Sequence, residues 1–193
     1  MQKILKPKNK IIIGIDPGYD RLGICILEKN SQNENKLLFS DCLESDKKQE
    51  LNERIFNLCQ KVKKIILNFS ARGGPVSGGQ NQKEIEMAIE KLFFTTNQKT
   101  AMGVSQLRGA IIYLANTLNI KVVEYTPLQI KIALTGYGKA EKKQVEFMVD
   151  KILNLKKNNI ENKNVKKIKS VKIIDDEYDA IACALTHAAI LRL

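Results

Sequence analysis

Short apolar runs, each bounded by polar or Gly-containing turns, mark the strands of the predicted fold. The first three runs follow one another through short polar connections, which predicts an antiparallel meander. The last two alternate with longer amphipathic segments. The expected strands are residues 11–16, 22–28, 36–42, 85–89 and 121–125. Gly23 lies in the second of them, where a missing side chain allows a neighbouring backbone to approach closely.

Apolar residues that recur every three or four positions predict the helices. The clearest series is Val104, Leu107, Ile111, Leu114 and Leu118, with Met102, Ile112 and Ala115 adding apolar surface on another side. A helix that is apolar on more than one side is deeply buried or packs on a second subunit. Further helices are expected at about 46–68, 128–134, 139–153 and 176–193. Three strands followed by alternating strands and helices predict a mixed α/β layer sandwich.

Three polar stretches interrupt this pattern: a basic N-terminal tail at 1–10, a Gly-rich segment at about 70–82 and a Lys-rich linker at about 154–172. The Gly-rich segment lacks the GK[ST] ending of a phosphate-binding loop, so we interpret it as an insertion. The chain has 193 residues. This length fits a single domain, in which these stretches are a tail, an insertion and a linker.

The chain carries a net charge of +11, and +7 of it comes from residues 139–172, where 11 Lys face 4 acids. Such a balance indicates a polyanionic partner, nucleic acid before membrane, with simple solubility as the alternative. The four cysteines are widely spaced and form no CxxC pair, which argues against a zinc site and fits a reducing cytoplasm. We see neither a signal peptide nor an apolar run of membrane-spanning length.

One carboxylate sits where the first strand ends. Asp16 follows an Ile-rich run and precedes Pro17 and Gly18, which stop strand pairing and turn the chain. Folds of the α/β type place metal ligands and catalytic acids at such strand ends. The alternative is an Asp that only stabilises a turn. Glu90 ends the fourth predicted strand, and if the two strands are parallel neighbours, both carboxylates emerge at the same edge.

A second group of acids opens the last predicted helix. These are Asp175, Asp176, Glu177 and Asp179, of which Asp176 and Asp179 share one face. One or two acids in a first turn complement the helix dipole, but additional ones repel each other, and a cation relieves that repulsion. Carboxylates without His or Cys favour Mg²⁺ or Mn²⁺. We interpret His187, the only histidine, as a packing or surface residue.

The candidate active site is therefore Asp16, Glu90, Asp176 and Asp179. Four carboxylates around two divalent ions, roughly 3.5–4 Å apart, form a site that cuts phosphodiesters. In such a site one ion activates water and the other stabilises the leaving oxygen.

Several segments, taken in order, resemble the RuvC family of Holliday-junction resolvases, within the ribonuclease-H-like superfamily. The matching segments are 14–18 with Gly23, 88–93, 97–109 with its Leu107-Arg-Gly109 end, 125–131, 135–144, and 176–182 with Thr186 and His187. They extend over nearly the whole chain, which makes the resemblance much more specific than the first motif alone.

The resemblance implies a three-layer sandwich around a mixed five-stranded sheet, with three antiparallel strands and then two parallel ones. It implies a crossover junction endodeoxyribonuclease of recombination and repair, in which Asp16, Glu90, Asp176 and Asp179 bind two Mg²⁺ per subunit, with Mn²⁺ able to substitute. Phe93, Lys131 and Lys142 match DNA-contacting residues, and Lys143 is a plausible neighbour. The implied partners are a second copy of the chain, four-way junction DNA, and the branch-migration proteins RuvA and RuvB.

Two other functions compete with this one. A protein of the same fold could bind branched nucleic acid without cutting it, although the intact set of acids argues against this. Actin-like ATPases and sugar kinases also open with a GxDxG-type strand, but they are generally longer and contain the fold twice.

Overall fold

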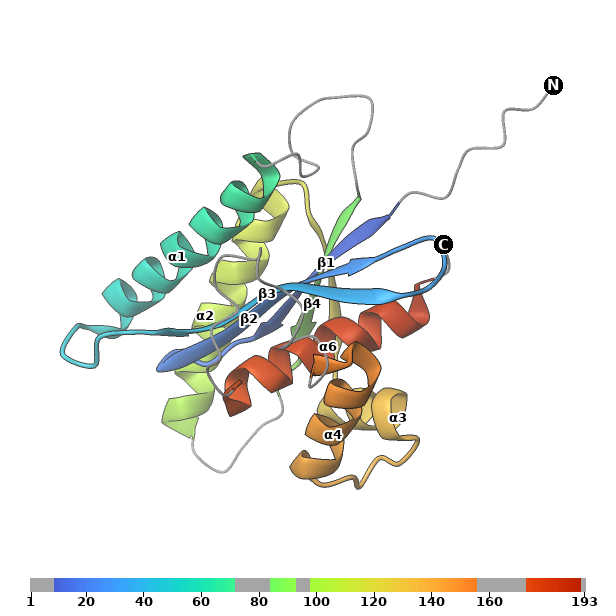
Figure 1. The fold of residues 1–193 in the computed structure, drawn as a ribbon. Coiled ribbons are helices and arrows are strands. Elements are labelled where there is room, and N and C mark those ends of the chain that lie inside the picture. Colours follow the sequence, from blue (N-terminus) through green and yellow to red (C-terminus); the bar gives the residue numbers. More distant parts are fainter. Residues whose placement is uncertain (1–8, 72–83, 93–97, 156–172, 192–193) are drawn as a thin grey trace.

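A mixed five-stranded sheet forms the centre of the molecule, with helices on both faces (Figure 1). The computed structural model describes residues 9–71, 84–92, 98–155 and 173–191. Its strands are β1 (Lys10–Asp16), β2 (Arg21–Lys29), β3 (Asn35–Glu44), β4 (Ile85–Glu90) and β5 (Lys121–Tyr125). Its helices are α1 (Leu51–Ala71), α2 (Gln98–Thr117), α3 (Pro127–Thr135), α4 (Lys142–Leu153) and α6 (Asp175–Ile190).

The order of the strands in the sheet is β3-β2-β1-β4-β5. The first three strands pair antiparallel, whereas β1 with β4 and β4 with β5 pair parallel. The antiparallel meander and the mixed five-stranded sheet expected from the sequence are therefore confirmed. Ile15 pairs with Ile89 in the parallel register, so the next residues, Asp16 and Glu90, end neighbouring strands at the same edge.

Two apolar cores, one on each face of the sheet, hold the layers together. The first lies beneath α1 and α2, where residues such as Leu58, Val62, Leu107 and Ile111 are almost completely buried. The second lies beneath α6, α3 and α4 and includes a run of small and apolar residues from α6. Each fully buried Leu or Ile contributes roughly 1.5–3 kcal/mol, so both layers are firmly attached.

Glycines let α6 lie unusually close to the sheet. A Cβ added at Gly14 would lie 2.1 Å from the Ala180 carbonyl oxygen, and one at Gly23 would lie 1.9 Å from the Asp176 carbonyl oxygen. Real Cβ atoms do not approach that closely, so no larger residue fits without moving the helix. The close approach expected at Gly23 is confirmed, and it places the first turn of α6 over β2.

Two helices begin later than the periodicity predicts. The expected start of α1 at 46 is wrong, because Asp46 forms a turn: its side chain accepts from Lys48 N at 2.9 Å and its carbonyl from Gln49 N at 3.1 Å. The expected start of α4 at 139 is also wrong. Ala140 N donates to the Tyr137 carbonyl at 3.1 Å, which closes a separate turn.

Phe93 lies outside the described residues. So do most residues of the N-terminal tail, of the Gly-rich insertion and of the Lys-rich linker. Within the ranges that the structure does describe, none of the helices combines the length and the apolar character needed to cross a bilayer.

Candidate active site

Asp16 and Glu90 lie side by side in the sheet, each half-buried at the end of its strand. Burial, followed by repulsion from Glu90 and Asp179, raises the pKa of Asp16 to about 8. Burial and the charge of Asp179 raise the pKa of Glu90 to about 7, against the opposing effect of Lys142 and Lys131. The two strand-end acids therefore interact electrostatically with the acids at the start of α6.

Asp176 and Asp179, one turn apart on α6, each have a cationic partner. The Lys142 Nζ lies 2.7 Å from Asp179 Oδ2, and the Arg21 Nη2 lies 3.1 Å from Asp176 Oδ2. Burial raises the pKa of Asp179, while its hydrogen bond to Lys142 acts in the opposite direction. Two basic side chains, from the starts of α4 and β2, thus neutralise the acids that α6 brings to the sheet edge.

The other two acids of this helical turn have different surroundings. Asp175 is exposed, with Lys142 Nζ 3.7 Å away. Glu177 accepts a 2.7 Å hydrogen bond from Ser40 Oγ, which ties the helix to β3. The structure therefore separates the four acids of this turn into two that interact with Asp16 and two that do not belong to the site.

The four predicted acids interact electrostatically, but their side chains are not arranged as a complete metal-binding site. Among the described residues, no three His, Cys, Asp or Glu side chains are arranged so that they could hold a metal ion together. The donor set nevertheless suits a hard divalent ion, since it consists of carboxylates alone. The raised pKa values of Asp16 and Glu90 point the same way, because a cation relieves the repulsion that contributes to them.

The loop that follows Asp16 is held by a buried arginine of α1, which the sequence reading missed. Arg54 donates to the Tyr19 carbonyl at 3.2 Å and to Ser45 Oγ at 2.9 Å, and it forms an ion pair with Asp20. Its guanidinium also lies over the Tyr19 ring, 4.9 Å from the centroid. In the sequence Arg54 is one of many charged residues on an amphipathic helix, so no local signal distinguishes it.

Removing this arginine should loosen the loop. We expect Arg54→Ala to lower the free energy of unfolding by about 2 kcal/mol, because the charge-assisted hydrogen bonds to Ser45 and Tyr19 and the ion pair with Asp20 are lost together. Lys47→Ala is the matched control, since the exposed Lys47 only approaches Asp20 at 3.7 Å and should cost less than about 0.5 kcal/mol. Urea unfolding of both variants measures the difference, and equal stabilities would contradict the role given to Arg54.

His187 lies outside the candidate site. It is buried, with Nδ1 2.7 Å from the Tyr125 hydroxyl and Nε2 3.1 Å from Glu86. Burial lowers its pKa, although Glu86 acts in the opposite direction. Of the two alternatives left open by the sequence, packing is the one that the structure supports.

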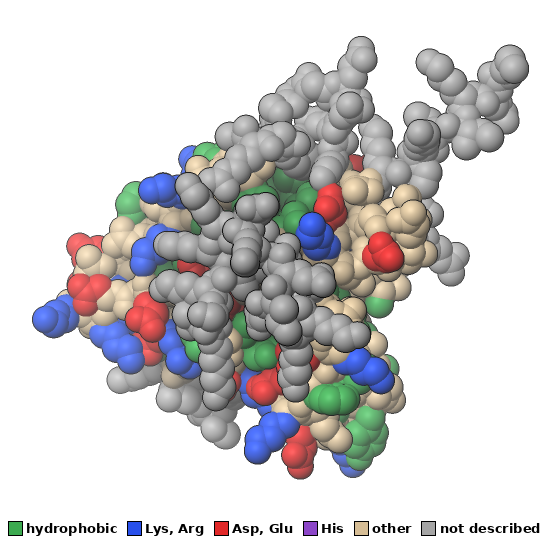
Figure 2. All heavy atoms as spheres, in the orientation of Figure 1, with side chains coloured by type: hydrophobic (Ala, Val, Ile, Leu, Met, Phe, Trp, Pro, Cys, Tyr) green, Lys and Arg blue, Asp and Glu red, His purple; other side chains and the backbone are tan. Residues whose placement is uncertain are grey.

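The three lysines predicted to contact DNA differ in how closely they approach the acids. Lys142 contacts Asp179 directly, and Lys131, half-buried on α3, is close enough to lower the pKa of Glu90. Lys143 is exposed on α4, next to Lys142. On the face visible in Figure 2, basic and acidic side chains are interspersed over the described surface.

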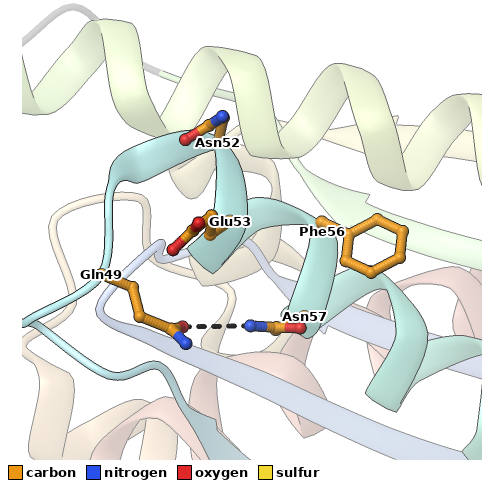
Figure 3. A pocket seen from close by; sticks show the side chains of 5 residues that line it. All are labelled: Gln49, Asn52, Glu53, Phe56 and Asn57. Carbon is orange, nitrogen blue, oxygen red and sulfur yellow. Dashed lines mark hydrogen bonds between the residues drawn. The ribbon is translucent and has the colours of Figure 1, made fainter.

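A shallow hollow at the start of α1 is separate from these residues (Figure 3). Its lining is polar apart from Phe56, and Gln49 and Asn57 are joined across it by a 3.0 Å hydrogen bond. None of the predicted site residues lines this hollow, so the acids at the sheet edge remain the better candidate for chemistry.

The fold and the position of the acids define a protein of the ribonuclease-H-like class: a mixed sheet in this order, with carboxylates at the ends of two parallel strands and on the helix packed across them. The model of the family "Crossover junction endodeoxyribonuclease RuvC" matches residues 12–187. The chain belongs to the RuvC family.

Relatives agree with this assignment over nearly the full length. The crossover junction endodeoxyribonuclease RuvC of Petrotoga mobilis is 35% identical over 177 residues, which are 92% of this chain and 92% of the relative. Among solved structures, Thermus thermophilus RuvC is 26% identical with a TM-score of 0.71, and 93% of each chain is covered. The same bacterium's RuvC in complex with a Holliday junction substrate is 24% identical in its aligned part, with a TM-score of 0.70 over 93% of each chain.

Proposed function

We propose that this chain is a structure-selective endonuclease that resolves four-way DNA junctions by paired symmetric nicks, in homologous recombination and repair. One observation carries the proposal: in a chain of the RuvC family, the fold brings the carboxylates of Asp16, Glu90, Asp176 and Asp179 into one electrostatic neighbourhood. The names of its relatives and the junction complex of the Thermus thermophilus relative support the choice of substrate.

Asp16, Glu90, Asp176 and Asp179 would hold two Mg²⁺ per subunit, with Mn²⁺ able to substitute. Bound there, the ions would supply nucleophile activation and charge stabilisation for phosphodiester hydrolysis. The chain itself contributes orientation. The register of β1 and β4 sets two of the carboxylates, the close packing of α6 on β2 sets the other two, and Lys142 restrains Asp179.

DNA would approach this edge of the sheet along the lysines of α3 and α4. Lys131, Lys142 and Lys143 suit backbone phosphates. The family resemblance adds Phe93 as an aromatic contact to the unstacked junction centre, where stacking on a base is worth roughly 1–3 kcal/mol. Binding that depends on phosphate contacts weakens steeply as salt rises.

We further propose that the chain acts as a homodimer through the outer face of α2, since paired nicks in a two-fold junction require a two-fold enzyme. Met102 and Tyr113 are 64% and 72% exposed on α2. Gly109 is spaced to share their face, and no described atom lies within 4 Å of where its Cβ would be. Large apolar residues around a glycine suit close packing of two helices.

Tyr113→Glu should therefore weaken self-association by about thirtyfold, because a charge would replace an aromatic anchor at the interface. Phe147→Glu is the control: this aromatic is 61% exposed on α4, which packs on the opposite face of the sheet, and the dimer should persist. Sedimentation velocity over a concentration series measures both. If Tyr113→Glu associates as the wild type does, the interface lies elsewhere.

Interaction with RuvA and RuvB and a cytoplasmic location are further proposals that follow from the family. The four cysteines are free, which suits a reducing compartment.

The activity itself is tested on a synthetic mobile four-way junction, with linear duplex of the same sequence as the control. We expect paired nicks in the junction with Mg²⁺ or Mn²⁺, none with a chelator and far fewer in the duplex. Junction binding without nicks under either metal would favour the non-cutting alternative, a protein that only grips branched nucleic acid.

A further inference from the structure

Arg21 is a cation at the candidate site to which the function described so far gives no role. It is the first residue of β2, and its Nη2 lies 3.1 Å from Asp176 Oδ2. The Arg21 side chain is 52% exposed, whereas that of Asp176 is 18% exposed. One end of this ion pair is therefore open to solvent, and to a ligand that approaches the sheet edge.

The backbone of Arg21 is fixed much more firmly than its side chain. A Cβ added at Gly18 would lie 2.2 Å from the Arg21 carbonyl oxygen, so the loop after Asp16 packs directly on this residue. On the other side, Arg21 is paired in register with Glu44 of β3. The guanidinium, at the end of a long flexible side chain, can thus change partners while its Cα stays beside the acids.

A metal ion and the Arg21 guanidinium would compete for Asp176. Both are cations, and an oxygen that coordinates a divalent ion is a much poorer hydrogen-bond acceptor for an adjacent positive group. The Cys42 Sγ, 3.9 Å from the same Oδ2, carries no such positive charge and would not be repelled in this way. On this side of the site, Arg21 is the group that has to move.

We infer that Arg21 neutralises Asp176 in the metal-free site and, once a metal ion takes Asp176, turns to bind a phosphate of the DNA strand that is cut. This inference rests on the proposed nuclease function. An arginine suits this second role, because its planar fork of N–H donors matches the oxygens of a phosphate. Arg21 and Lys142 would then both approach the strand, one from β2 beside Asp176 and the other from α4 beside Asp179.

Two measurements on Arg21→Gln test the exchange. The first is thermal unfolding of the DNA-free protein during titration with MnCl₂: without its competitor, the metal should bind at a concentration about threefold lower, in line with a partly exposed ion pair. The second is single-turnover nicking at saturating Mn²⁺, which should be about tenfold slower once a charge-assisted phosphate contact is lost. Tighter metal binding together with slower cutting is a combination that general damage to the fold does not produce.

Lys121→Gln is the matched control, since it removes one exposed charge that is paired to a carboxylate, Glu86, at 3.3 Å, at the opposite end of the parallel strands. It should change neither quantity. Arg21→Lys keeps the charge without the fork and should give an intermediate nicking rate. An Arg21→Gln variant with the wild-type metal midpoint, or with the wild-type rate at saturating Mn²⁺, overturns the role of Arg21. A wild type that neither binds Mn²⁺ nor cuts would instead overturn the proposed function.

Discussion

Asp16→Asn is expected to slow nicking of a four-way junction by about a thousandfold or more while leaving junction binding nearly unchanged. The side chain lies at the centre of the acid group, where it interacts with Glu90, Asp176 and Asp179. Loss of a metal ligand removes several kcal/mol of transition-state stabilisation, and about 4 kcal/mol corresponds to roughly a thousandfold in rate. Single-turnover nicking and a gel-shift titration measure the two quantities separately.

The same substitution should stabilise the metal-free protein. The pKa of Asp16 is raised in the folded chain from its ordinary 3.8 to about 8, so ionisation of Asp16 opposes folding. This penalty is absent below pH 3.8 and grows as the pH rises toward 8. Near pH 7 it amounts to about 4 kcal/mol, at about 1.4 kcal/mol for each pH unit above 3.8, which an uncharged Asn does not incur. Thermal unfolding with a chelator present should therefore give a higher Tm for Asp16→Asn than for the wild type.

Asp41→Asn provides the control for both effects, because Asp41 is an exposed acid of β3 and is not one of the candidate ligands. Its nicking rate and its Tm should match the wild type. An Asp16→Asn variant that cuts at the wild-type rate would show that Asp16 has no part in the chemistry. A lower Tm without metal would show that the Asp16 charge does not oppose folding.

Gly23→Ala is expected to have the largest effect on stability, with a loss of about 3 kcal/mol or more in the free energy of unfolding. The new methyl group would lie 1.9 Å from the Asp176 carbonyl oxygen, so either β2 or the first turn of α6 has to shift. Overpacking against backbone is costly because backbone cannot move aside by changing rotamer. Since Asp176 is on the shifted turn, nicking should fall as well.

Gly103→Ala allows a graded comparison. A methyl group there would meet the Tyr19 ring at 2.9 Å, which is a side chain and can adjust. Urea unfolding should therefore show a much smaller loss than for Gly23→Ala. If the two losses are equal, or if Gly23→Ala is as stable as the wild type, α6 does not depend on glycine for its position.

Much of this fold follows from local patterns in the chain. The apolar run that ends at Asp16 and the one that ends at Glu90 are strands. They are parallel neighbours, which is the condition under which the sequence predicts both acids at one edge. The predicted starts of α1 and α4 were wrong because hydrogen bonds within single turns, at Asp46 and Tyr137, took the place of the first helical turn. Periodicity of apolar residues does not register such turns.

The residues that hold the site in place were harder to predict, because their roles depend on contacts between segments that are distant in the sequence. Arg54 of α1 is joined to Tyr19 and Asp20 only after the sheet and helix have packed together. Likewise, nothing around Arg21 in the sequence indicates that it meets Asp176, which lies far along the chain. That the four acids bind metal stays a prediction, since two of them, Asp179 and Asp176, are paired with Lys142 and Arg21 in the structure.

A crystal structure of the protein with Mn²⁺, with the metal located by its anomalous scattering, tests the central claim most directly. We predict manganese at the edge of the sheet, bound by carboxylate oxygens of Asp16, Glu90, Asp176 and Asp179 at about 2.0–2.3 Å, in the range typical of hard divalent ions. Manganese bound elsewhere, or four carboxylates that stay too far apart to share an ion at saturating Mn²⁺, would contradict it.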